Sequence, residues 1–154
     1  MAAFDVTVAV AAPPGRTWDA LTDWASHGEW IPFTRMTVTS ERPRGLGSSF
    51  VGRTGIGPFG FDDPMVVVGW QPPEGAVPGT CSVRKTGRVV LGWASFEVAP
   101  RPGGCRVSWH EEVELAPVRL TRPLGPLLSA LGRVAFRTSL RRFARRVEAG
   151  VSGG

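Results

Sequence analysis

The sequence contains few cysteines and no long apolar run, and both absences limit what the protein can be. Its two cysteines, Cys81 and Cys105, lie in no C-x-x-C motif, which favours a reduced, cytoplasmic protein. No apolar run approaches the roughly 18 residues that a membrane-spanning helix requires. The apolar N-terminus has no basic region and is interrupted by Asp5, so we expect a strand there and not a signal peptide. The sequence therefore predicts a soluble protein without an integral membrane segment.

Lysine is also scarce, because Lys85 is the only lysine among 18 basic residues. The formal net charge is +5, and seven arginines lie between Arg119 and Arg145 at helical spacings. This pattern favours a solvated helix face, and no aromatic residues alternate with the arginines as they do where bases stack. We therefore expect no nucleic-acid partner. One alternative stays open, in which the protein is an interaction module that binds an acidic partner or an anionic membrane through Arg133, Arg137, Arg141 and Arg145.

Signatures of metal-dependent and nucleophilic catalysis are missing as well. His27 and His110 are the only histidines, and no H-E-x-x-H motif or zinc-type Cys/His spacing occurs. The chain has no G-x-S-x-G motif, and the glycine-rich segment 55–60 lacks the G-K-[ST] ending of a phosphate loop. We expect no metal and no cofactor, and we interpret segment 55–60 as a flexible turn.

What the sequence does contain is a succession of short amphipathic segments. Phe4, Val6, Val8 and Val10 alternate with other residues, which predicts a strand that ends at Pro13. Two short helical pieces follow, over residues 16–25 and from residue 23 to Trp30. Strands are then predicted over 36–42, 47–54, 59–71 with a bulge or bend at 62–64, 80–86, 89–98 and 105–115. A long helix over 123–147 comes last, and its apolar positions change side near Gly132, which indicates a kink or a new packing partner.

This order of elements predicts an α+β fold. Consecutive strands without intervening long helices form an antiparallel sheet, here of about seven strands. The terminal helix is apolar on two sides, so we expect it to be held inside the curved sheet, beside an apolar cavity. The 154 residues suit one domain over 1–150, and we interpret 151–154 as a flexible tail.

The segment VTVAVAAPPGRTWDALTDWASHGEWIP (residues 6–32) resembles bacterial polyketide cyclase/dehydrase-like proteins of the SRPBCC, or START/Bet v 1-like, superfamily. The matching features are the proline that ends the first strand, Trp18, Asp23-Trp24 and Trp30-Ile31-Pro32. Further matches are Gly47 to Phe50, Trp70 to Pro73 and Phe96 to Pro100. The resemblance implies a helix-grip fold around a cavity, in a superfamily that includes lipid and hormone binders as well as aromatase/cyclases.

The final strand carries the most informative polar residue. Period-2 alternation puts Val107, Trp109, Glu111 and Val113 on one face, which we expect to face the cavity. Glu111 would then be a carboxylate on an apolar wall, able to act as a general acid or base. The alternative is that Glu111 lies at the mouth or pairs with an arginine such as Arg137. His110 and Glu112 fall on the outer face.

Other candidate ligand contacts follow from strand parity and from positions near the expected mouth. Phe96 and Val98 share one inner face. Val66, Val68 and Trp70 are expected on another, although the apolar Met65 and Val67 leave the register of that strand open. Trp30 and Phe59 lie at element ends, where a flat apolar ligand would enter. The predicted ligand-binding set is Trp30, Phe59, Val68, Trp70, Phe96, Val98, Trp109, Glu111 and Leu131.

Two cavity-based functions follow, besides the interaction module. The leading hypothesis is a protein, monomeric or homodimeric, that binds, carries or sequesters a lipid-like or polycyclic aromatic molecule. The other is a polyketide cyclase/dehydratase-like enzyme in which Glu111 acts with Arg53 or Arg137 on a polyketone. Such catalysis needs at least two polar groups that converge on one ligand position.

Overall fold

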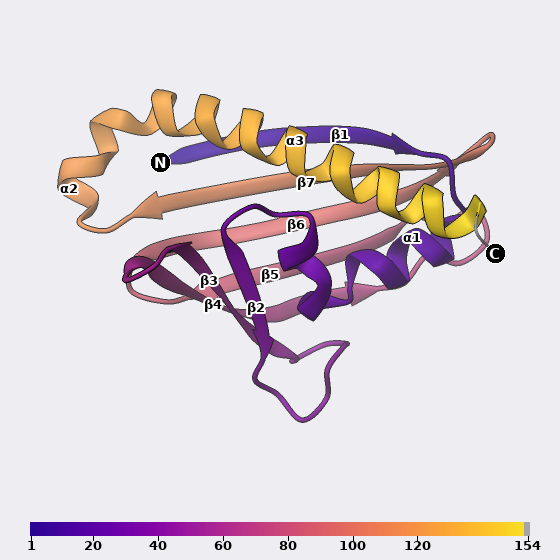
Figure 1. Cartoon of the computed structure of the whole chain (residues 1–154), viewed down its shortest axis with the longest axis horizontal. Helices are drawn as coiled ribbons and strands as arrows, with labels where there is room; N and C mark the ends of the chain where they lie inside the picture. The colour runs from indigo at the N-terminus through magenta and orange to yellow at the C-terminus, as the bar shows by residue number, and fades with distance from the viewer. Residues whose placement is uncertain (153–154) are drawn as a thin grey trace.

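Seven strands form one sheet, which a long C-terminal helix crosses in the computed structural model of the protein (Figure 1). The structure describes residues 1–152. The strands are β1 (Ala2–Val10), β2 (Thr34–Val38), β3 (Ser49–Ile56), β4 (Phe59–Gln71), β5 (Gly79–Thr86), β6 (Val90–Arg101) and β7 (Gly104–Leu115). The helices are α1 (Pro14–Leu21), the 3-10 turns η1 (Trp24–Glu29) and η2 (Arg122–Leu124), α2 (Val118–Thr121) and α3 (Gly125–Ser152).

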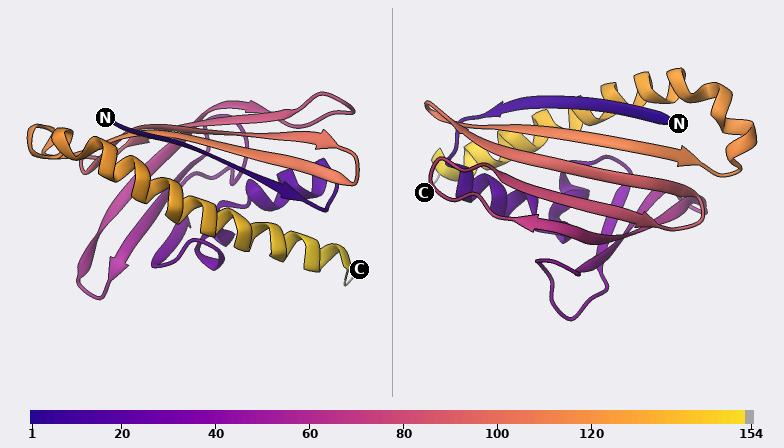
Figure 2. Two further views of the ribbon diagram at one scale, coloured as in Figure 1. Left: turned by 90° about the horizontal axis from the view of Figure 1, so that it is seen from above. Right: turned by 180° about the vertical axis from the view of Figure 1, so that it is seen from behind.

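The sheet is antiparallel throughout, in the order β1-β7-β6-β5-β4-β3-β2. Strands β2 to β7 therefore form a meander, and β1 closes it by pairing with the last strand. The sheet curls over α3 and the short helices (Figure 2). The predicted α+β helix-grip architecture is confirmed.

One end of the molecule is filled by aromatic side chains. Helix α1 begins after Pro13, with Pro14 in its first turn, where a missing backbone N–H costs nothing. Its buried Trp18 lies against Trp70 and Phe96, with ring centroids 5.1 and 5.6 Å apart. These rings fill the space beneath α1, and no residue of α1 lines the cavity described below.

Helix α3 packs on this core with its C-terminal half and on β1 with its middle. Leu140, Phe143 and Val147 are buried. A side chain at Gly132 would put its Cβ 2.6 Å from the ring of Phe4, so glycine is what lets the helix approach β1. The predicted change of packing partner near Gly132 therefore corresponds to the contact with Phe4.

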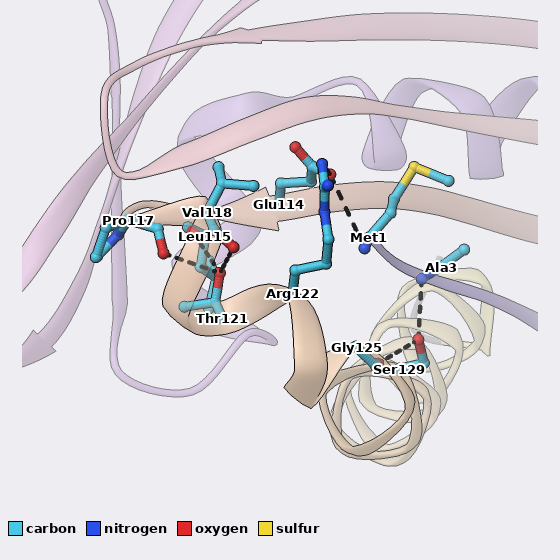
Figure 3. Close-up of polar contacts among 10 residues, drawn as sticks. All are labelled: Met1, Ala3, Glu114, Leu115, Pro117, Val118, Thr121, Arg122, Gly125 and Ser129. Carbon is cyan, nitrogen blue, oxygen red and sulfur yellow. Dashed lines mark hydrogen bonds and ion pairs between the residues drawn. The ribbon is translucent and has the colours of Figure 1, made fainter.

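The N-terminal end of α3 is fixed to the edge of the sheet (Figure 3). The Ala3 amide donates a hydrogen bond to the Ser129 hydroxyl at 3.0 Å, and that hydroxyl donates to the Gly125 carbonyl at 2.8 Å. In the preceding turn, the Thr121 hydroxyl donates to the Leu115 carbonyl at the end of β7. These contacts set the distance between α3 and the sheet, and with it the height of the space between them.

Strand β4 departs from the prediction in the position of its bulge. The register with β3 is continuous through residues 62–64, and the irregularity lies between Val67 and Gly69, at Val68. One extra residue moves every later side chain to the opposite face. Asp63 and Val67 therefore share the inner face with Trp70, and Val68 points outward at 46% exposure.

The two ends of the long helix also differ from the prediction. Residues 122–124 form the separate turn η2, and α3 begins at Gly125 and not at Pro123. Helix α3 continues to Ser152, into the segment that the sequence predicts to be a tail. Residues 153 and 154 of that predicted tail lie outside the described residues.

Candidate functional site

A cavity of about 580 Å³ lies between α3, the segment from η1 to β2, and the inner face of the sheet. Cavities of this size hold drug-sized ligands. Most of its wall is apolar, and Phe33, which is 67% exposed, marks its rim. The apolar wall includes Phe4, Trp24, Ile31, Met36, Phe50, Phe61, Met65, Val83, Ala94, Phe96, Trp109, Val113, Leu128, Ala135 and Phe136.

Three charged side chains meet in this wall. The Lys85 ammonium lies 2.6 Å from Asp63 Oδ2 and 3.1 Å from Glu111 Oε1. The indole N–H of Trp109 donates to Glu111 Oε2 at 3.4 Å. The side chains of Lys85, Asp63 and Glu111 are only 4%, 13% and 8% exposed. We call these three residues the lysine cluster.

The sheet register explains how the cluster forms. Asp63 lies on β4, Lys85 on β5 and Glu111 on β7, so β6 separates the lysine from Glu111. Neighbouring strands are about 4.8 Å apart, and a lysine side chain is long enough to span the intervening strand. On β6, Gly92 lies opposite Lys85 and Ala94 lies opposite Glu111. These small residues leave the space through which Lys85 reaches Glu111.

The carboxylates determine the charge state of the lysine. Burial by itself would lower the pKa of Lys85, but the charges of Glu111 and Asp63 and their hydrogen bonds outweigh it and raise the pKa above its usual value. Lys85 is therefore a permanent cation at neutral pH. Its cluster places one ammonium beside two carboxylates in an apolar wall.

The cluster also contains an unsatisfied acceptor. Asp63 Oδ1 is buried and has no hydrogen-bond partner among the described residues. A buried polar atom without a partner costs about 1–3 kcal/mol, and ionised groups in an apolar wall add a desolvation cost. A group of charges kept at such a cost is more typical of a functional site than of a structural core.

A second polar group of the wall is His27 of η1. Its Nε2 lies 2.7 Å from the Leu21 carbonyl, which can only accept, so Nε2 carries the proton. Burial lowers the pKa of His27 to about 4, with smaller opposing contributions from the Leu21 hydrogen bond and from Asp23. The imidazole is therefore neutral, and its unprotonated Nδ1 is an acceptor. The ring contacts Trp24 and Trp30, at centroid distances of 5.4 and 4.7 Å.

Three of the predicted ligand-binding residues lie in the cavity wall, namely Phe96, Trp109 and Glu111. Their parity on β6 and β7 is the predicted one, because neither strand has a register shift within its pairing with the other.

The other six predicted residues do not line the cavity. Val98 is fully buried on the inner face of β6, Trp70 packs on Trp18, and the buried Trp30 packs on Phe143. Val98 and Trp30 belong to the buried core, and the partly buried Trp70 packs against it. Three more are exposed, for different reasons. Phe59, at 81%, lies at the tip of the β3–β4 hairpin, Val68 is turned outward by the bulge, and Leu131, at 58%, lies on the outer side of α3.

The predicted partners of Glu111 are also corrected. Arg53 is exposed and pairs with Asp62 on the outer face at 3.2 Å, since the inner positions of β3 are Phe50 and Gly52. Arg137 is exposed on α3. Glu111 is thus buried and paired, but its cation is Lys85 and not an arginine of the last helix.

Sequence reasoning missed Lys85, Asp63 and His27. Lys85 is the sole lysine, and it alternates in phase with the buried Cys81 and Val83, a signal that would have placed it inside. The inward orientation of Asp63 was not predicted, because an irregularity was expected at residues 62–64. The position of His27 depends on the path of η1, which no periodicity predicts.

Among the described residues, no group of three or more His, Cys, Asp or Glu side chains is arranged to hold a metal ion. Within the same part of the chain, no helix is both long and apolar enough to cross a membrane.

Comparison with known proteins identifies a family and a shared fold. Residues 1–148 match the sequence profile of a family described as polyketide cyclase / dehydrase and lipid transport. A search of the curated proteins by sequence finds none that matches. Among solved structures, a protein from Thermus thermophilus is similar over 96% of this chain and 98% of its own, with 14% identity and a TM-score of 0.78.

Aromatase/cyclases are among the similar structures. Zhui aromatase/cyclase from Streptomyces is 14% identical over 97% of this chain and 94% of its own, with a TM-score of 0.69. The di-domain ARO/CYC StfQ of the steffimycin biosynthetic pathway is 15% identical with a TM-score of 0.73. This chain is covered to 99% in that comparison and spans about half, 52%, of StfQ. At these identities the likeness concerns the fold alone.

Proposed function

The chain belongs to the polyketide cyclase/dehydrase and lipid transport family, and we propose that it binds a hydrophobic small molecule, lipid-like or polycyclic aromatic, in its cavity. The observation that carries this proposal is an apolar space of about 580 Å³ with a single charged cluster in its wall. Apolar surface supplies most of the affinity for such a ligand, and a few fixed polar groups orient it. Here those groups are the lysine cluster and His27.

Filling the cavity from α3 tests this proposal. Ala135 lines the cavity, and we expect Ala135→Trp to weaken binding of anilinonaphthalene sulfonate, a fluorescent hydrophobic probe, by at least about tenfold. The physical reason is that the indole takes space that the probe would occupy. Fluorescence titration measures the change, and native mass spectrometry of the purified wild-type protein tests for a bound ligand.

The matched control is Ala130→Trp, which adds the same indole to an exposed position of the same helix outside the cavity wall. It is expected to bind the probe like the wild type. Equal affinity in both variants would show that the probe does not occupy this cavity, and that result would contradict the proposal.

A second function is favoured by the lysine cluster in particular. Cyclase chemistry needs two or more polar groups that converge on one ligand position, and the cluster provides a cation and two carboxylates. In this alternative, the Lys85 ammonium polarises a carbonyl of a polyketone, and the Glu111 carboxylate removes a proton from an adjacent methylene. The enolate carbon attacks a second carbonyl carbon, and the new alkoxide takes up the proton. Loss of that hydroxyl with a further methylene proton, as water, completes the dehydration.

Glu111→Gln separates the two functions. If the protein is a cyclase, the variant is expected to bind a polyketone with nearly unchanged affinity and to lose at least about 100-fold in turnover, because the amide cannot accept the proton. Lys85 keeps Asp63 as its partner, so the variant should fold. The measurement is product formation by chromatography beside probe affinity. No turnover in the wild type would leave the binding function alone, and equal turnover in both proteins would show that Glu111 is not the base.

A further inference from the structure

Five apolar side chains are exposed in a row along α2, η2 and α3. They are Leu120, Leu124, Leu127, Leu131 and Val134, which are 73%, 48%, 56%, 58% and 64% exposed. We call them the leucine stripe. Single exposed leucines are common, but contiguous apolar patches on a protein surface mark contact sites.

The spacing puts the stripe on one side of α3. Leu124, Leu127, Leu131 and Val134 are separated by three, four and three residues, the intervals that share one helix face. Other faces of α3 are occupied, since Leu128 and Ala135 line the cavity and Leu140 packs in the core. The stripe is therefore an additional apolar face that no part of residues 1–152 covers.

The fold presents this face in a fixed position. The hydrogen bonds of Ser129 and Thr121 hold the start of α3 and the preceding turn on β1 and β7 (Figure 3). Glu114 of β7 also lies 3.7 Å from Arg122. The stripe is thus part of an anchored helix, and its exposure does not come from a loosely attached end.

The charges beside the stripe have one sign. No acidic residue occurs between Glu114 and Glu148, and this segment contains eight arginines, all exposed. Arg122 and Arg146 have acidic partners. The other six form no ion pair with any described residue, and they are Arg119, Arg133, Arg137, Arg141, Arg142 and Arg145.

We propose that the leucine stripe and these six arginines form a docking surface for an anionic lipid bilayer. A helix with leucines on an exposed face and arginines beside them suits the boundary between acyl chains and anionic headgroups. Each arginine near such a surface contributes favourable electrostatic energy. A nucleic acid would match the arginines but leave the leucines exposed. A second copy of the chain would cover the leucines but bring the arginines of both copies together, which like-charge repulsion opposes.

The surface has a direct geometric relation to the cavity. Leu128 and Ala135 of the cavity wall lie on the same helix, within one residue of Leu127 and Val134 of the stripe. Docking would therefore place one wall of the cavity beside the bilayer. The proposed surface does not depend on the proposed ligand. It rests on exposed residues, and no residue of the leucine stripe lines the cavity.

Vesicle flotation tests the surface. The wild-type protein is expected to float with vesicles of phosphatidylcholine mixed with phosphatidylglycerol, but not with phosphatidylcholine alone, and high salt should weaken the binding. Leu127→Ser combined with Leu131→Ser, and separately Arg137→Gln combined with Arg141→Gln, should each lower the partition coefficient by about 20-fold or more. Probe binding in the cavity should stay at the wild-type level in both variants.

The matched control is Val68→Ser combined with Arg84→Gln, which removes an exposed apolar side chain and an exposed arginine from the outer side of β4 and β5. It should float like the wild type. Three results would overturn the proposal: no binding to the anionic vesicles, equal binding to phosphatidylcholine alone, or equal loss in the control. A wild-type dimer that the leucine variant dissociates, together with absent flotation, would identify a second copy as the occupant.

Discussion

Lys85→Met is expected to lower the free energy of unfolding by about 3–5 kcal/mol at neutral pH. The methionine fills most of the same space, but Asp63 and Glu111 are left as two carboxylates in an apolar wall without their cation. Removing one partner of a buried ion pair is costly because the remaining charge keeps its desolvation penalty. Urea unfolding followed by circular dichroism measures the loss.

The pH dependence of this loss identifies its cause. Acid neutralises the two carboxylates, so the difference between variant and wild type should narrow as the pH falls. The combined variant Lys85→Met, Asp63→Asn and Glu111→Gln has no charge left in the wall and should recover much of the lost stability. In the wild type, the pKa of Lys85 is higher in the folded protein than its usual value of 10.5. The stability that Lys85 contributes to folding is therefore fully present below pH 10.5 and is lost as the pH rises through the higher folded pKa.

Arg84→Met is the matched control, because Arg84 precedes Lys85 on β5 but is exposed. Its effect should stay within about 0.5 kcal/mol, as for most surface substitutions. An equally small effect at Lys85 would contradict the electrostatic account of the cluster, and a loss that is independent of pH would attribute the effect to packing.

The second large effect is a loss of stability in mild acid that comes from His27. Its pKa is about 4 in the folded protein against an ordinary value of 6.5, so between these values the unfolded chain binds a proton that the folded protein does not. The stability that the neutral His27 contributes to folding is therefore fully present above pH 6.5 and falls as the pH drops toward 4. Over this range the free energy of unfolding is expected to fall by about 3 kcal/mol.

Chemical denaturation at a series of pH values measures this slope, and His27→Gln should remove it even if the substitution itself costs stability. His110 provides the contrast. Its hydrogen bond to Asp5, followed by the one to Glu112, raises its pKa despite slight burial, so its contribution is present below pH 6.5 and is lost as the pH rises. His110→Gln should therefore change the pH dependence in the opposite sense. An unchanged acid slope in His27→Gln would rule out His27 as its source.

Protonation of His27 would also change the polarity of the cavity wall. Protonation of Nδ1 would convert an acceptor into a donor and place a cation in contact with Trp24 and Trp30. A ligand held by that acceptor would dissociate over the same pH range in which stability falls, so probe binding measured in parallel would show whether His27 contacts the ligand.

The two proposals concern different parts of the protein. The proposed ligand would meet the lysine cluster on the inner face of the sheet, and the proposed bilayer would meet the leucine stripe on the outer side of α3. The variants proposed for each leave the other intact, because no residue of the stripe lines the cavity. The ligand-binding and membrane-binding hypotheses can therefore fail independently.

The sequence by itself determined the order of elements and the parity of the regular strands. Alternation is a local property, and on β6 and β7 it correctly assigned Phe96, Trp109 and Glu111 to the inner face. The resemblance in residues 6–32 correctly indicated the helix-grip fold. Both conclusions rest on patterns of residues that lie close together in the sequence, so they can be made without the tertiary structure.

Only the tertiary structure decided which inner residues line the cavity and which cation meets Glu111. A one-residue bulge at Val68 reversed the faces of β4, and no local pattern marked it. Lys85 reaches Glu111 only because β6 lies between their strands with Gly92 and Ala94 at the crossing. The boundary between solid core and open cavity is set in the same way, by where α1 and α3 approach the sheet. These are distances between residues far apart in the chain, and they exist only once the sheet has curled around its helix.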